Sequence, residues 1–70
     1  MAALSDPDPV ARHLRAAETH DLAAVRHDEA VAFWLQQGDE VRAELERRNA
    51  RIERDAAQLE RDRAAVEAAG

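Results

Sequence analysis

Apolar residues recur at seven-residue intervals along almost the whole chain. One such series consists of Val10, Ala17, Ala24, Val31, Gly38, Leu45, Ile52, Leu59 and Val66. Seven residues are close to two turns of an α-helix, so the members of a series lie on one helix face. The pattern predicts an all-α protein built from long helices that pack along such faces.

Local helix signals divide this pattern into two parts. Pro7 and Pro9 each follow an aspartate, and this combination suits a helix start because the carboxylate can cap free amides while proline loses no hydrogen bond. Gly38 suits the left-handed residue that ends a helix, and Asp39 suits the cap of the next one. We expect a frayed segment at residues 1–6 and a helical hairpin at 7–70, with helices at about 8–37 and about 40–69 and a turn at 38–39.

Folding the chain at Gly38 would bring the two halves of the series face to face. Its inner pairs would oppose a small and a large residue, such as Ala24 and Ile52, and so fill the space between close antiparallel helices. The expected hairpin seam consists of Val10, Ala17, Ala24 and Val31 with Leu45, Ile52, Leu59 and Val66. A further row lies on the other side of the second helix and consists of Ala43, Ala50, Ala57, Ala64 and Ala68. It is interpreted as helix-promoting filler, and a flat surface on which another helix packs closely is the alternative.

A single continuous helix that dimerises as a long coiled coil is the alternative architecture. One glycine inside a helix costs only about 1 kcal/mol, so Gly38 alone does not forbid it. The alternative is disfavoured because a second series, of histidines and alanines, does not continue beyond Trp34 and Val41. Gly38 would also leave a hole at a seam position, so the hairpin is the preferred prediction.

The amount of large apolar side chain predicts self-association. The chain has 70 residues, enough for one domain, and its apolar share of 46% includes 17 alanines. So thin a core leaves an isolated hairpin marginally stable, and several larger side chains cannot all face the same helix. We expect two hairpins to pair as a dimeric four-helix bundle. The expected interface residues are Leu14, Leu22, Val25, Phe33, Trp34 and Leu35.

Charge and cysteine content narrow the possible partners. The net charge is −5, which argues against nucleic acid and anionic membranes. The absence of cysteine excludes disulfides, thiolate metal sites and cysteine nucleophiles. We see no basic, apolar leader and no stretch able to span a bilayer, so no membrane association and a cytoplasmic location are expected.

Three histidines are the candidate metal ligands. His13, His20 and His27 lie seven residues apart, which is about 10.5 Å along a helix, whereas metal-binding pairs are spaced by three or four. A site would therefore need ligands from the second helix or from another chain. We interpret the histidines as partly buried seam residues and expect no cofactor; a metal-binding helical bundle stays open as the alternative function.

Catalysis has little support in the sequence. His20 and Asp21 are neighbours whose side chains diverge by about 100° on a helix, and Ser5 and Thr19 are the only hydroxyl residues. We therefore expect no enzyme activity.

An arginine stripe raises a second alternative, a nucleic-acid-associated regulator. It consists of Arg47, Arg51, Arg54 and Arg61. Acidic residues are interleaved with these arginines, as on an ordinary solvated helix face. The preferred function is a non-enzymatic, self-associating helical interaction module, acting as scaffold, adaptor or small regulatory subunit, with another protein as a further candidate partner.

Overall fold

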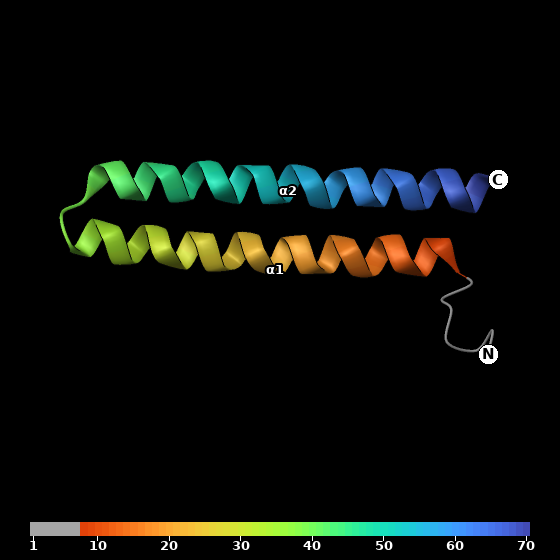
Figure 1. The fold of residues 1–70 in the computed structure, drawn as a ribbon, viewed down its shortest axis with the longest axis horizontal. Helices are drawn as coiled ribbons and strands as arrows, with labels where there is room; N and C mark the ends of the chain where they lie inside the picture. The colour runs from red at the N-terminus through yellow and green to blue at the C-terminus, as the bar shows by residue number, and fades with distance from the viewer. Residues whose placement is uncertain (1–7) are drawn as a thin grey trace.

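Two long helices make up nearly all of the described chain. The computed structural model describes residues 8–70, so the fraying expected at residues 1–6 lies outside the described part. Helix α1 spans Pro9–Gln36 and α2 spans Glu40–Ala69. The two run antiparallel and side by side, so that the start of α1 and the end of α2 share one end of the molecule (Figure 1). The expected helical hairpin is confirmed, and the continuous helix is not formed.

Helix α1 begins where the sequence offers a cap. Asp8 has an extended backbone, and its carboxylate accepts hydrogen bonds from the amides of Val10 at 3.0 Å and Ala11 at 3.3 Å. These amides have no partner within the helix, so the aspartate satisfies them. Pro9 occupies the first turn, where its missing N–H costs nothing.

The turn reverses the chain within three residues. Gly38 has a φ of +74°, a backbone conformation that residues other than glycine rarely adopt. The amide of Gly38 donates to the carbonyl of Leu35 at 3.0 Å, and the amide of Asp39 donates to the carbonyl of Trp34 at 2.9 Å, which is the Schellman arrangement. The carboxylate of Asp39 then accepts from the amide of Arg42 at 2.9 Å and starts α2. Both expected turn residues thus end one helix and begin the next.

Alanine fills the space between the helices. Every buried hydrophobic residue among residues 8–70 is an alanine: Ala17 and Ala24 from α1 with Ala43, Ala50, Ala57 and Ala64 from α2. Val10 and Val31, the remaining members of the expected α1 half of the seam, are half-buried. The expected seam is therefore located correctly on α1.

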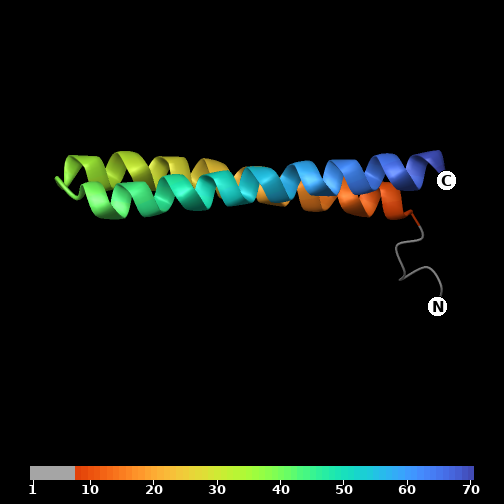
Figure 2. The same ribbon diagram turned by 90° about the horizontal axis from the view of Figure 1, so that it is seen from above.

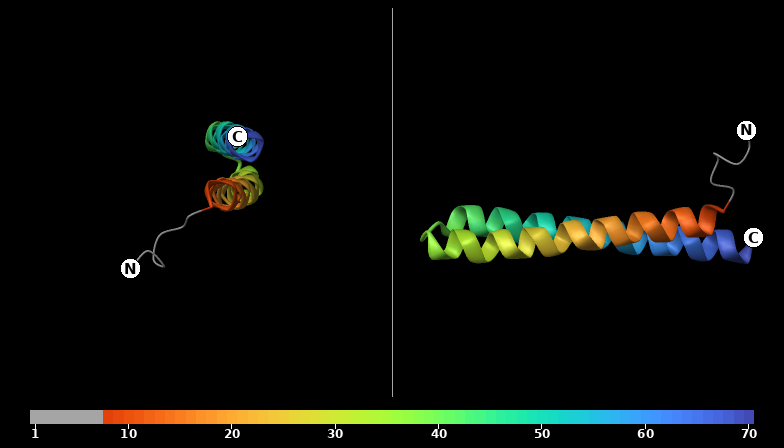
Figure 3. Two further views of the ribbon diagram at one scale, coloured as in Figure 1. Left: turned by 90° about the vertical axis from the view of Figure 1, so that its right-hand side faces the viewer. Right: turned by 90° about the horizontal axis from the view of Figure 1, so that it is seen from below.

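On α2 the seam prediction is wrong. Leu45, Ile52, Leu59 and Val66 are exposed, and the alanine row interpreted as filler faces α1 instead. Leu45 follows Ala43 by two residues, or about 200° of helix rotation, so the two rows lie on nearly opposite sides. Alanine lets the two helices approach closely and wind around each other, as the crossing ribbons show (Figures 2 and 3). That approach brings polar and charged side chains on both edges of the seam into contact.

Candidate functional site

A ladder of three histidine–glutamate pairs runs along one edge of the seam. In each pair the histidine Nδ1 from α1 lies within hydrogen-bond distance of a glutamate Oε2 from α2. The Nδ1···Oε2 distances are 2.7 Å for His13–Glu60, 2.8 Å for His20–Glu53 and 2.6 Å for His27–Glu46. Each step up α1 by seven residues matches a step down α2 by seven, so one helix register makes all three pairs.

The ladder is most enclosed at the open end of the hairpin. There the side chains of His13 and Glu60 are only 19% and 12% exposed. The hydrogen bond with His13, and then one with Arg63, lower the pKa of Glu60 below its usual 4.5. Glu60 is thus held as a carboxylate whose two oxygens both have partners: Oε2 contacts His13, and Oε1 accepts from Arg63 at 2.5 Å.

The opposite edge of the seam carries aspartate–arginine pairs. Arg54 donates to Asp28, and Arg61 donates to Asp21. The hydrogen bond with Arg54 lowers the pKa of Asp28. Two members of the predicted arginine stripe are therefore bound by α1 carboxylates instead of facing solvent unpaired. The others also have acidic neighbours, since Arg47 and Arg51 both lie near Glu44.

These cross-helix pairs were not anticipated, although the sequence holds a signal for them. On α1, a histidine stands three residues after Val10, Ala17 and Ala24, and an aspartate stands four residues after the last two. On α2, a glutamate and an arginine stand three and four residues after most of the buried alanines. In an antiparallel pair the two rows that lie three residues after the seam positions face each other, which pairs histidine with glutamate. The two rows that lie four residues after the seam positions also face each other, which pairs aspartate with arginine. Comparing the flanks of each candidate row would have identified the correct seam.

The ladder has limited means for chemistry. A histidine held by a carboxylate can act as a general base, but among the described residues the hydroxyl group is that of Thr19, which donates to the carbonyl of Arg15. Nor do the histidines gather: in residues 8–70 no group of three or more potential ligands lies close enough to hold a metal ion. The arrangement connects the two helices through hydrogen bonds and sets their rotation.

The expected aromatic interface residues lie beside the turn. Phe33 and Trp34 meet edge to face with ring centroids 4.9 Å apart, and the guanidinium of Arg42 lies 5.1 Å from the Trp34 ring centroid. Trp34 is half-buried, so it closes the turn end of the hairpin, whereas Phe33 is exposed. The remaining expected interface residues, Leu14, Leu22, Val25 and Leu35, are all exposed on α1.

The most regular apolar surface lies on α2, facing away from α1. This surface, the α2 stripe, consists of Leu45, Ile52, Leu59 and Val66. Ile52 is 62% exposed and Val66 is 71% exposed. Four aliphatic side chains at seven-residue spacing on a solvated face resemble the seam of a coiled coil that lacks its second helix.

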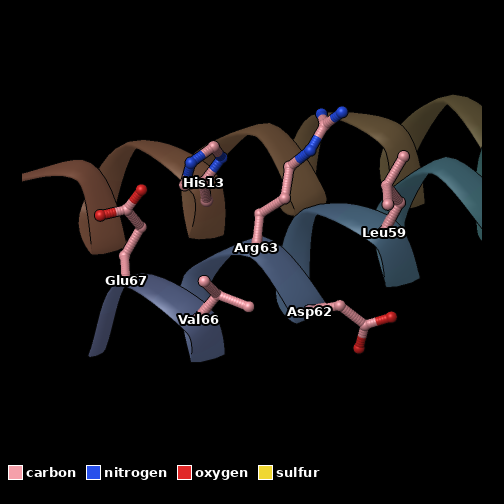
Figure 4. Close-up of a pocket in the computed structure, with 6 residues that line it drawn as sticks. All are labelled: His13, Leu59, Asp62, Arg63, Val66 and Glu67. Carbon is pink, nitrogen blue, oxygen red and sulfur yellow. The ribbon is translucent and has the colours of Figure 1, made fainter. Parts of the chain in front are cut away.

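A shallow, open depression adjoins the end of the α2 stripe. It is lined by His13 from α1 and by Leu59, Asp62, Arg63, Val66 and Glu67 from α2 (Figure 4). Two of these residues belong to the stripe, and charged side chains border them. The depression is too open to exclude water, so it suits contact with another helix better than enclosure of a small molecule.

Comparisons with known proteins add no assignment. No known protein family, curated protein sequence or solved structure matches the chain. Neither α1 nor α2 contains an apolar stretch that would allow it to cross a membrane.

Proposed function

We propose that this protein is a non-enzymatic helical interaction module that self-associates as a dimer of hairpins. One observation carries the proposal: the large aliphatic residues of α2 are exposed while alanines occupy the interface between the helices. Fully burying a leucine, isoleucine or valine side chain is worth about 1.5–3 kcal/mol. Covering the part of the α2 stripe that is still exposed would therefore add burial of large aliphatic side chains, which the alanine seam does not supply.

The thin core supports the same proposal. Ordering each residue costs about 1–2 kcal/mol for the backbone alone, and an alanine side chain returns little by burial. Helix hydrogen bonds and the high helix propensity of alanine offset part of that cost. Packing against a second copy buries aliphatic surface without lengthening the polypeptide, which is the usual way that short helical units reach stability.

The charges favour a protein partner over nucleic acid. Arg54 and Arg61 are paired with α1 aspartates, and the chain carries a net charge of −5. A phosphate backbone would have to displace those carboxylates and approach an acidic molecule. In a dimer that exposes its ends and outer faces, further protein partners would be recruited by the assembled hairpins, in the manner of a scaffold or adaptor.

Sedimentation velocity over a wide concentration range tests the proposal. The expected result is a species of twice the 7.8 kDa chain mass at micromolar concentration, with a melting temperature that rises with concentration. A species of single-chain mass at high micromolar concentration, with a melting temperature independent of concentration, would refute self-association.

A further inference from the structure

The α2 stripe has the length and symmetry to pair with itself. Its residues Leu45, Ile52, Leu59 and Val66 are exposed and evenly spaced over most of α2. Resting on the proposed self-association, we propose that α2 of a second copy packs antiparallel on this stripe, with Leu45 opposite Val66 and Ile52 opposite Leu59 of the other copy. The two α2 helices then form the centre of the assembly, and each α1 lies outside.

Charges beside the stripe select the antiparallel direction. Arg48, Asp55 and Asp62 form one flank, each three residues after a stripe residue, and Val41 begins this flank four residues before Leu45. Within the hairpin, the rows that lie three residues after the seam positions meet each other across the interface, as His13 and Glu60 do. The same rule places Arg48 beside Asp62 of the second copy, twice per dimer. A parallel pair would instead bring Arg48 level with Arg48 and Asp62 level with Asp62.

Apolar overlap selects the register. Sliding one copy by seven residues in one direction would place Ile52 opposite itself and leave Val66 of each copy without a partner. Sliding in the other direction would place Leu59 opposite itself and leave Leu45 uncovered. In the proposed register all four stripe residues of both copies are covered. Asp55 then lies near its own counterpart at the two-fold axis, but a like-charge contact at a solvated rim changes affinity far less than two uncovered valines do.

Site-specific cross-linking tests the geometry directly, because the chain has no cysteine. A short bismaleimide is added to Leu45→Cys, to Val66→Cys, to Ile52→Cys, and to an equimolar mixture of the first two variants. We expect efficient cross-linking only in the mixture. Cross-linking of Leu45→Cys alone would overturn the antiparallel direction, and cross-linking of Ile52→Cys alone would overturn the register.

Paired substitutions test the surface itself. Ile52→Asp is compared with Val25→Asp, which changes another exposed aliphatic residue, near the middle of α1. We expect Ile52→Asp to weaken dimerisation by at least about 100-fold, since both copies lose an apolar contact, while its helix content is retained and Val25→Asp has little effect. The reverse result would place the interface on α1 and overturn this inference while self-association stands. A wild-type chain that stays monomeric would instead refute the proposed function as a whole.

Charge reversal adds a rescue. Arg48→Asp and Asp62→Arg each place like charges together and should raise the dissociation constant several-fold. The double variant restores the opposite-charge contact between copies, so its dissociation constant should return toward that of the wild type. If the loss of dimerisation free energy in the double variant equalled the sum of the losses in the two single variants, the proposed contact would be overturned.

Discussion

Replacing Ala57 by leucine would test whether alanine packing holds the hairpin together. Ala57 is fully buried between the helices. Ala65, about two turns further along α2, is exposed and receives the same substitution as a control. Alanine and leucine have similar helix propensities, so any difference between the two variants reports on the seam.

The expected loss follows from the closeness of the helices. Inserting extra carbons into a packed interface costs about 1–3 kcal/mol, because side chains leave their preferred rotamers or the backbone moves. Here the helices can separate to make room, but separation would lengthen the contact between His13 and Glu60, which are 2.7 Å apart. We expect Ala57→Leu to lose about 2 kcal/mol, which for a domain of this size lowers Tm by about 8–16 °C.

Thermal and urea unfolding monitored by circular dichroism, at one low protein concentration for all variants, measures this difference. Ala65→Leu should unfold within about 0.5 kcal/mol of the wild type, as most surface substitutions do. If Ala57→Leu were as stable as the wild type, the alanine row would not be the interface. Such a result would revive the arrangement in which Leu45 and Ile52 face α1.

Three further outcomes follow from the geometry. Gly38→Ala should cost about 1 kcal/mol and Gly38→Asn less, because φ is +74° while no atom lies within 4 Å of an added Cβ; equal unfolding free energies would contradict this. The pKa of Glu60 is lowered by its hydrogen bond with His13, so the Glu60 carboxylate stabilises the folded state fully above the usual pKa of 4.5, and this stabilisation is lost as pH falls through the lower pKa of the folded state. Urea titrations at several pH values should therefore show that the free energy of unfolding depends less on acid pH in Glu60→Gln than in the wild type. A double-mutant cycle with His20→Ala and Glu53→Ala should give a coupling of about 0.2–1 kcal/mol, as expected for a half-exposed pair, and strict additivity would deny the contact a role.

Local signals in the sequence predicted the hairpin because they act within a few residues. Gly38 and Asp39 fix the end of α1 and the start of α2 through hydrogen bonds to nearby backbone groups. A cap depends on one side chain and the next few amides, so its chemistry is readable without knowing the rest of the fold. The seven-residue series likewise located the α1 half of the seam.

The α2 half of the seam was harder to predict because two rows share the same seven-residue spacing. Preference for burying large side chains selected the row of Leu45 and Ile52, and the structure buries the row of Ala50 and Ala57. Burial preference treats each side chain separately. The choice between rows instead depends on how closely the helices approach and on which charges meet at the edges, and both are properties of the pair of helices.

The repeats also leave one quantity undetermined, the relative sliding of the two helices, and the turn supplies it. Sliding α2 by seven residues would again place alanine against α1 and a glutamate against His20, because Glu46, Glu53 and Glu60 are equivalent members of one row. Such a slip would need a longer connection than the three residues that the Schellman turn provides. Trp34 reinforces the choice, because it occupies the next position of the histidine row and contacts Arg42 instead of a glutamate. The ladder therefore sets how the helices face each other, and the turn sets where along their length they meet.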